Sequence, residues 1–372
     1  MAFMKLEERW DTGLMPERYK SEDALELAER VARIKRRFGS RLFLPGHHYQ
    51  KDEVIAFADA TGDSLQLAQA GAANRKAEFI VFLGVHFMAE TADILSSDRQ
   101  AVLLPDLRAG CSMADMADRH QTERCWEALT ERFGDTVIPV TYVNSTAAIK
   151  AFVGRRGGAT VTSSNAADML KWAWQRKKRI LFLPDQHLGR NTAFRLGVAR
   201  REMAVWDPIG HVLQQDEEGP WEDVRIILWK GHCSVHQNFT LQQVQSIRRN
   251  DPERRIIVHP ECSFEVVQAA DEVGSTHRII KALEAAPSGS RWAVGTEMNL
   301  VNRLKRQLSD KDIVSLSPQM CPCLTMNRID LPHLAWTLDE LEQGRLVNRI
   351  QVDGQTAADA KLALDRMLER DS

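Results

Sequence analysis

Six cysteines are the residues of this 372-residue sequence most able to hold a metal or to do redox chemistry. Three of them follow short apolar runs of strand length: Cys111 after VLLPDLRAG, Cys233 after RIILWKGH and Cys321 after IVSLSPQM. The absence of CxxC pairs disfavours a zinc ribbon or knuckle. Three thiolates at one point would suit a 4Fe-4S cluster with one open iron, or a Cys₃ zinc site that keeps a water. Buried inert thiols are the alternative.

Hydroxyl groups recur just before helix-like segments. Ser64, Ser163 and the pair Ser275-Thr276 each occupy such a place. Helix N-termini suit carboxylate and phosphate ligands, so these residues are candidate anion contacts. The simpler interpretation is that each serine only caps the helix that follows it.

Histidines and carboxylates able to exchange protons occupy other loops. His47 and Tyr49 belong to the run GHHYQKDEV, and Glu261 belongs to the run HPEC. His236 follows a cysteine by three residues. Acid–base catalysis uses such groups where they are positioned against a substrate. Taken singly, each is equally an ordinary polar loop residue or a surface carboxylate.

Short apolar runs supply the elements that would position these groups. They are rich in Val, Ile, Leu and Phe rather than alternating, which is typical of strands covered on both faces. Amphipathic segments lie between them, such as Glu22–Phe38, for which we expect Ser21 as the N-cap and Gly39 as the end. The alternation predicts an α/β fold with mainly parallel sheets. The expected strands are Leu42–Leu44, Phe79–Val85, Val102–Leu104, Val137–Val143, Ile180–Leu183, Ile226–Trp229, Ile256–Val258, Trp292–Val294 and Ile313–Leu316.

The chain runs through the same four steps three times, which indicates an internal repeat. The steps are a strand with a polar loop, a hydroxyl at a helix start, a strand with a polar tip, and a strand that ends at cysteine. The first step, for example, occurs as LFLPGHHYQ, VIPVTYVNS and IIVHPECSF. We therefore expect three α/β domains at 1–115, 116–235 and 236–330, with the tail 331–372 packed on the first. The segment 201–223 breaks the pattern and indicates an excursion in the second domain.

The overall composition is that of an ordinary folded protein, with 44% hydrophobic and 27% charged residues. A formal net charge of −2 creates no field that favours nucleic acid or an anionic membrane. No apolar run reaches the length of a membrane helix, and the N-terminal residues lack the features of a signal peptide. We expect a cytoplasmic protein with neither a nucleic-acid nor a membrane partner.

The runs GHHYQKDEV, YVNSTA, TSSNA, GRNTA, WKGHCSVH, HPEC, GTEMN and CPCLTMN, in this order, resemble the quinolinate synthase family of bacterial de novo NAD biosynthesis. The resemblance extends over residues 20–345. It implies three homologous three-layer α/β/α domains with mainly parallel sheets around a pseudo-threefold axis, and a 4Fe-4S cluster in a central cavity. It also implies condensation of iminosuccinate with dihydroxyacetone phosphate to quinolinate, phosphate and water. A partner enzyme, L-aspartate oxidase, would supply the iminosuccinate and contact this chain transiently.

The same resemblance implies a role for each matching residue. Proton transfer is implied for Tyr49, His236 and Glu261. Cluster ligation is implied for Cys111, Cys233 and Cys321. Substrate contacts are implied for His47, Ser64, Tyr142, Val143, Asn144, Ser163, His259, Pro260, Glu261 and Thr276. Two residues at a strand tip, Thr296 and Glu297, are left out of this set.

The third cluster ligand is ambiguous from the residues alone, because Cys321 and Cys323 flank Pro322 in the same short loop. Only one of them can bind if the fourth iron is to stay open. Family members tend to have their ligand cysteine directly before a proline and shortly before a Met-Asn pair, so the resemblance favours Cys321. We expect Cys125 and Cys262 to be buried thiols.

Two other functions remain open. The same three thiolates would serve a zinc-dependent hydrolase or aldolase, or a non-catalytic iron–sulfur redox sensor. Colour separates the metals, since an iron–sulfur protein is brown and a zinc protein is colourless. A sensor would not need an array of loops suited to carboxylates and phosphate.

Overall fold

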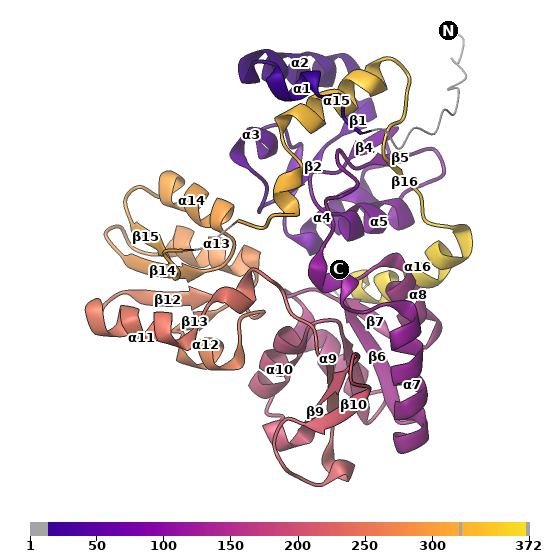
Figure 1. Ribbon diagram of the computed structural model, residues 1–372, viewed down its shortest axis with the longest axis vertical. Coiled ribbons are helices and arrows are strands. Elements are labelled where there is room, and N and C mark those ends of the chain that lie inside the picture. Colours follow the sequence, from indigo (N-terminus) through magenta and orange to yellow (C-terminus); the bar gives the residue numbers. More distant parts are fainter. Residues whose placement is uncertain (1–13, 320–321, 370–372) are drawn as a thin grey trace. The chain divides into compact units, whose positions relative to one another are not determined.

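The computed structural model describes residues 14–319 and 322–369 of the chain (Figure 1). Two compact units result. The first comprises the chain up to Cys111 together with Leu324–Val352, and the second comprises Ser112–Cys323 together with the chain from Asp353 onward. Cys321, the expected third ligand, lies outside the described residues. Within the two described ranges, no helix has both the length and the apolar character needed to cross a bilayer.

The first unit is built on short strands, most of them parallel. They are β1 (Leu42–Phe43), β2 (Pro45–His47), β3 (Ala60–Gly62), β4 (Phe79–Val81), β5 (Ala101–Leu103) and β16 (Arg349–Ile350). The main sheet has the order β1-β4-β5-β16, in which only β16 is antiparallel to its neighbour. The strands β2 and β3 form a separate parallel pair that continues from the end of β1. The helices of this unit are α1 (Arg18–Ser21), α2 (Ala24–Phe38), α3 (Asp52–Ile55), α4 (Ser64–Ala73), α5 (His86–Leu95) and α15 (Leu331–Glu342).

The second unit contains two sheets. The strands of the larger sheet are β6 (Val137–Tyr142), β7 (Ala159–Val161), β8 (Arg179–Leu183), β9 (Met203–Asp207), β10 (Val212–Gln215) and β11 (Ile226–Trp229). They run in the order β10-β9-β11-β8-β6-β7, and only β10 is antiparallel to its neighbour. The strands of the smaller sheet are β12 (Arg255–Val258), β13 (Glu272–Val273), β14 (Arg291–Gly295) and β15 (Asp312–Ser315). This sheet is wholly parallel, in the order β13-β12-β14-β15.

Helices connect and cover these strands. They are α6 (Ser112–Asp115), α7 (Arg119–Phe133), α8 (Ala147–Arg155), α9 (Ala166–Trp174), α10 (Gln186–Arg195), α11 (Leu241–Asn250), α12 (Phe264–Ala269), α13 (Thr276–Ala285), α14 (Met298–Gln307) and α16 (Gly354–Leu368). A single 3₁₀ turn, η4 (His236–Asn238), follows β11. Every residue of β6, β8 and β11 is buried, as expected for strands covered on both faces.

The two sheets of the second unit share one strand order. The strand of the hydroxyl step lies beside the strand of the first step, followed by the polar-tip strand and the cysteine strand: β7-β6-β8-β11 and β13-β12-β14-β15. In the first unit the corresponding pairs are divided between two sheets: β3 pairs with β2 in one, and β1 pairs with β4 and β4 with β5 in the other. In each repeat the second strand therefore lies on one side of the first strand, and the third and fourth strands lie on the other, so the strand order reverses between the first and third strands. Open parallel sheets form ligand crevices at the carboxyl ends of strands where such a reversal occurs.

The sequence predicted these elements well where the apolar runs were long. The expected α/β fold with mainly parallel sheets is confirmed, and each expected strand is present to within a few residues. The short strands β2, β3, β7, β13 and β16 were not predicted, because two or three residues carry too little pattern. The excursion 201–223 contains β9 and β10, which extend the larger sheet.

The predicted start of the first long helix was wrong. Asp23, not Ser21, caps α2, and its carboxylate accepts from the N–H groups of Leu25 and Glu26. Ser21 instead ends the preceding short helix α1. The predicted end at Gly39 is confirmed, with the positive φ of 56° that glycine accommodates without strain.

The C-terminal tail divides between the units, whereas we expected all of 331–372 on the first repeat. Helix α15 packs against α2 in the first unit, but α16 packs along α8 in the second (Figure 1). The close approach depends on Gly154 of α8, since a β-carbon there would stand 1.9 Å from the main-chain oxygen of Asp359. Arg155 binds the Asp359 carboxylate at 2.8 Å, and Arg366 donates to the Gly158 carbonyl at 2.6 Å.

We predict that Gly154→Ala destabilises the protein. The added methyl forces α16 away from α8, and overpacking of this kind costs about 1–3 kcal/mol in the free energy of unfolding. Gly71→Ala in α4 is the matched control, because no atom lies within 4 Å of its β-carbon position. There the better helix propensity of alanine should stabilise by about 0.5–1 kcal/mol. Urea titration of both variants measures the difference, and equal effects would contradict the α8–α16 packing.

Candidate active site

The carboxyl ends of β12 and β14 meet at the winding reversal of the smaller sheet. His259, Pro260 and Glu261 follow β12 directly, and Thr296 follows β14 directly. His236 reaches the same place from η4, in the loop after β11. The three predicted site residues His236, His259 and Glu261 are thereby brought together.

A buried histidine–carboxylate pair forms the centre of this group. His236 Nδ1 lies 2.8 Å from Glu261 Oε2, and the two side chains are only 1% and 3% exposed. On its other side His236 Nε2 lies 3.2 Å from Thr296 Oγ1. An ionised carboxylate can only accept hydrogen bonds, so Nδ1 of His236 carries a proton when Glu261 is charged.

The surroundings of Glu261 favour its charged form. Burial acts to raise the pKa of Glu261, but electrostatic interactions with His259 and His236 and hydrogen bonds from His236 and Tyr142 lower it to about 2. Tyr142 is buried at the end of β6, so the larger sheet supplies one of these donors. Glu261 is therefore a carboxylate throughout the neutral pH range.

His259 is held as a neutral imidazole. Burial lowers the pKa of His259 to about 3, with Glu261 opposing the shift. Its ring stacks on that of His236 with centroids 4.4 Å apart, and its Nδ1 accepts the main-chain N–H of Glu261 at 3.3 Å. The ring thus fixes the direction of the Glu261 main chain.

The first unit repeats this local geometry with other residues. His47, at the end of β2, is buried, and its Nδ1 accepts the main-chain N–H of Tyr49 at 3.2 Å. The Tyr49 ring lies edge-on to that of His47, with centroids 4.6 Å apart. The runs HHY and HPE are therefore equivalent in structure, each presenting a protic side chain two residues after a buried histidine.

The predicted hydroxyls are not simple helix caps in the first two repeats. In α4 the reciprocal capping bonds join Asp63 and Gln66, so Ser64 is the first helical residue beside the cap. Ser163 stands three residues before α9, where Asn165 Oδ1 accepts the N–H of Thr162. The capping interpretation therefore fails for both serines.

In the third repeat the cap and its neighbour are also distinct residues. Ser275 caps α13 by accepting from Arg278, and the buried Thr276 begins the helix. Ser275 Oγ also bonds Ser164 Oγ at 3.0 Å, which joins the hydroxyl loops of the two sheets in the second unit. Val143 and Asn144, the remaining predicted contacts, continue from β6, and Val143 donates to the Val161 carbonyl at 2.8 Å.

The described cysteines fall into two groups. Cys111, Cys233 and Cys323 are half-buried, whereas Cys125 and Cys262 are fully buried. Burial raises the pKa of the Cys125 and Cys262 thiols well above the ordinary value, so neither is suited to bind a metal as thiolate. The expectation that both are buried thiols is confirmed.

Cys233 lies beside the histidine–carboxylate pair. Its sulfur, His236 and Glu261 offer ligand atoms that all lie within 4.8 Å of one another. A metal could be held here, although His236 and Glu261 already bind each other.

Two functional residues were missed by the sequence reasoning. Thr296 is the second partner of His236. Glu297 caps α14 by accepting from Asn299 and Leu300, and its other oxygen accepts the main-chain N–H of Cys323 at 3.3 Å. Burial raises the pKa of Glu297 to about 7, against the main-chain hydrogen bonds. Their position at a strand tip was the available signal, but a strand tip is also where ordinary caps stand.

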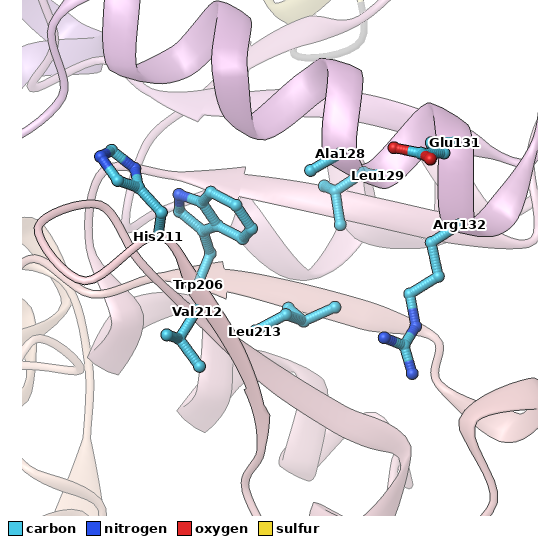
Figure 2. A pocket seen from close by; sticks show the side chains of 8 residues that line it. All are labelled: Ala128, Leu129, Glu131, Arg132, Trp206, His211, Val212 and Leu213. Atoms are coloured by element: carbon cyan, nitrogen blue, oxygen red, sulfur yellow. The ribbon is translucent and has the colours of Figure 1, made fainter.

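A separate hollow of about 510 Å³ lies between α7 and the β9–β10 hairpin (Figure 2). Figure 2 shows Leu129, Trp206 and Leu213 on its walls, with Glu131 and Arg132 on the helix. No residue predicted for the active site lines it.

Comparison with known proteins gives a consistent family. The family model described as quinolinate synthetase A protein matches residues 29–369. The chain is 64% identical over 370 residues to a quinolinate synthase of Anoxybacillus flavithermus, covering 100% of both chains. It is 67% identical over 354 residues to that of Geobacillus kaustophilus, covering 95% of this chain and 96% of the relative. A Bacillus anthracis quinolinate synthase is 63% identical over 357 residues, with 96% of each chain covered.

We predict that acid destabilises the protein through its buried neutral histidines. Burial lowers the pKa of His187 to about 4 and that of His259 to about 3, whereas the unfolded chain protonates both near pH 6.5. Stability is therefore lost as the pH falls below 6.5, by up to about 3 kcal/mol for each histidine at pH 4. Urea titrations between pH 7 and 4.5 measure the slope. In His187→Gln the slope should be shallower, and an unchanged slope would refute the assignment.

Proposed function

The chain belongs to the quinolinate synthetase A protein family, and on that basis we propose how its residues perform the reaction of a quinolinate synthase. The enzyme condenses iminosuccinate with dihydroxyacetone phosphate to quinolinate, phosphate and water. The observation that carries this function is 64% identity over the whole chain to a named quinolinate synthase. Neither alternative, a zinc hydrolase or aldolase or a redox sensor, is favoured by any of the named relatives.

We propose Cys111, Cys233 and Cys321 as the ligands of a 4Fe-4S cluster. The donor chemistry of this chain fits such a group: Cys111 and Cys233 are half-buried thiols after cysteine-step strands, while burial raises the pKa of Cys125 and Cys262 and disfavours their thiolates. When bound, a cluster with one iron free of protein ligands supplies a Lewis acid.

Proton transfer falls to His236, Glu261 and Tyr49. Glu261, ionised and buried, holds the proton of His236 on Nδ1, which leaves Nε2 as the atom that takes up or releases a proton. A carboxylate in this position also stabilises the imidazolium that forms. Thr296 Oγ1 orients the ring from the Nε2 side. Tyr49, whose ring lies edge-on to that of His47, supplies a phenolic O–H.

Hydroxyl and main-chain donors would bind the anionic groups of the substrates. Ser64 and Thr276 directly follow the caps of their helices, and Ser163 stands three residues before α9, so these hydroxyls near helix N-termini suit carboxylates. The other substrate contacts that we propose are His47, Tyr142, Val143, Asn144, His259, Pro260 and Glu261.

The proposed function extends to the domain organisation, the location and a partner enzyme. It includes three repeats at 1–115, 116–235 and 236–330 around a pseudo-threefold axis, and a cytoplasmic location. A transient contact with L-aspartate oxidase would deliver iminosuccinate before it hydrolyses.

The direct test is an anaerobic assay. Purified protein is incubated with dihydroxyacetone phosphate and freshly generated iminosuccinate, and quinolinate and inorganic phosphate are measured. We expect equal amounts of both products from a brown protein. Colourless zinc-loaded protein that is fully active, or brown protein without quinolinate formation, would overturn the proposal.

Glu261→Gln should leave the fold and the brown chromophore intact and lower kcat by about 10²–10⁴-fold. The amide keeps the shape of the side chain but loses the charge that holds the His236 proton. Rates are measured in the quinolinate assay, with visible absorption to verify cluster content. Near-normal turnover would remove Glu261 from proton transfer.

His236→Ala should damage catalysis far more than His232→Ala in the same loop. His236 is buried between Glu261 and Thr296, whereas His232 is half-exposed and its main chain contacts Met116. We expect a loss of at least about 10²-fold in kcat for the first variant and a small effect for the second. The reverse order would show that this loop was misassigned.

Cys321→Ser should abolish the brown chromophore, and Cys323→Ser should retain it. A cuboidal cluster with an open iron takes one ligand from this loop, and the family resemblance favours Cys321, which stands directly before Pro322. Anaerobic visible spectra and iron content decide between the two cysteines. Loss of colour in Cys323→Ser alone would identify the other cysteine as the ligand.

A further inference from the structure

Helix α10 presents a buried polar face that the mechanism above does not use. The helix packs against β8, β11, α9 and α12 within the second unit. Asp185, His187 and Asn191 lie on this face, and all three are buried. His187 Nε2 bonds Gln237 Oε1 at 2.7 Å, which ties the helix to the loop that carries His236.

Asn191 holds the loop that carries Glu261. Its amide nitrogen donates to the main-chain carbonyl of Pro260 at 2.8 Å and to that of Cys262 at 2.9 Å. Both acceptors are carbonyls, so only the nitrogen end of the amide can face them. The side chain is 1% exposed and grips the residues on either side of Glu261.

Asp185 is a buried carboxyl group at the N-terminus of the same helix. One oxygen accepts the N–H groups of His187 and Leu188, at 2.6 and 3.3 Å. The other oxygen, Oδ2, is fully buried and bonds no group in the described parts of the chain. A charged carboxylate is strongly disfavoured when one of its oxygens is buried without a hydrogen bond, whereas a protonated carboxyl group is not.

Glu297, the equivalent residue of the third repeat, differs from Asp185 in the hydrogen bond of its second oxygen. Glu297 caps α14 as Asp185 caps α10, but its second oxygen accepts a hydrogen bond from Cys323. Asp185 Oδ2 has no such bond within the described residues, and the charge of Glu261 acts on Asp185 instead. Burial, and then the charge of Glu261, raise the pKa of Asp185 well above the ordinary value, and its two main-chain bonds and Arg190 oppose this only in part.

The charged and titratable groups that interact electrostatically with Asp185 come from two elements. Glu261 and Cys262 lie on the loop after β12, and Arg190 lies on α10 itself. Arg190 is engaged by Asp216 in a bidentate pair at 3.0 and 3.1 Å, so it does not neutralise Asp185. Two buried carboxyl groups that act on each other electrostatically cannot both ionise easily, and Glu261 has hydrogen bonds from His236 and Tyr142, whereas Asp185 Oδ2 bonds no described group.

We propose that Asn191 and Asp185 are positioning residues for Glu261: Asn191 fixes its main chain from both sides, and Asp185, whose buried Oδ2 bonds no described group, is the protonated cap of the helix that carries Asn191. This assignment rests on the function proposed above, because Glu261 has its role only in that reaction. Glu261 can stay charged in its buried position because Asp185 carries no charge.

The protonation of Asp185 is tested by stability rather than by turnover. The unfolded chain ionises Asp185 above pH 4 and the folded chain does not, so the wild-type protein loses this stability as the pH rises. The Asp185→Asn variant cannot ionise at this position and therefore does not lose this stability as the pH rises. The Tm of the cluster-loaded variant relative to that of the wild type should therefore increase with pH, by roughly 3 °C or more between pH 5 and pH 8.

Two further variants sharpen this test. Asp118→Asn is the matched control, since Asp118 caps α7 on the surface and should show no pH-dependent difference. Asp185→Ser, an uncharged cap, should follow the trend of Asp185→Asn if the amide does not fit. A Tm difference that stays constant or falls as the pH rises would overturn the neutral acid.

The positioning role of Asn191 is tested by kinetics. Asn191→Leu removes both bonds while keeping the approximate volume, and should lower kcat about 10²-fold with KM changed less than threefold and the chromophore retained. Gln100→Leu in the first unit is the control, because it removes a buried amide that donates to a main-chain carbonyl at 2.9 Å.

The kinetic outcomes separate the two proposals. The control should lose thermal stability to a similar degree but keep its turnover. Equal losses of kcat in the two variants, or an active Asn191→Leu, would overturn the positioning role. Wild-type protein that forms no quinolinate would instead overturn the function, and the Tm comparison for Asp185 would still stand.

Discussion

A carboxylate withdrawn from water needs hydrogen-bond donors, and this requirement organises the second unit around Glu261. His236 donates from the loop after β11, Tyr142 bonds from the end of β6, and Asn191 of α10 holds the adjoining main chain. These groups belong to different elements of two sheets. The charge on Glu261 is therefore compatible with burial only when both sheets are folded and packed against each other.

The repeated strand order explains why chemistry gathers at the same places. In each repeat the loops after the first and third strands open where the winding reverses, so a residue placed there reaches a crevice. The three repeats use these positions differently. HHY presents a tyrosine and HPE a glutamate after a buried histidine, while the third strands end in Asp185 and Glu297. One backbone plan thus carries several kinds of acid and base.

At the helix N-termini, one residue caps the helix and its neighbour carries the candidate hydroxyl. A helix start needs a side chain to satisfy its first N–H groups, and Asp63 and Ser275 do this in two of the repeats. The adjoining Ser64 and Thr276 are therefore not required for capping. In the proposed reaction the N-terminal dipole and the hydroxyl would act together on a substrate anion.

The sequence by itself determined the strand positions, the parallel α/β class, the repeated steps and most of the candidate residues. These features follow from local patterns: apolar runs long enough for buried strands, and short motifs in a fixed order. It misplaced the cap of α2, missed strands of two or three residues, and assigned the whole tail to one repeat. Such details depend on a single hydrogen bond or on one close approach, as at Gly154.

Only the tertiary structure decided the partners and charge states. That His236 lies between Glu261 and Thr296, that Cys262 is inert, and that the charge of Glu261 acts on Asp185 cannot be read from a linear chain. A pKa depends on burial and on groups distant in sequence, and a carboxylate in HPEC looks the same on a surface as in a core. Function in this chain therefore rests on motifs that the sequence displays and on environments that folding alone creates.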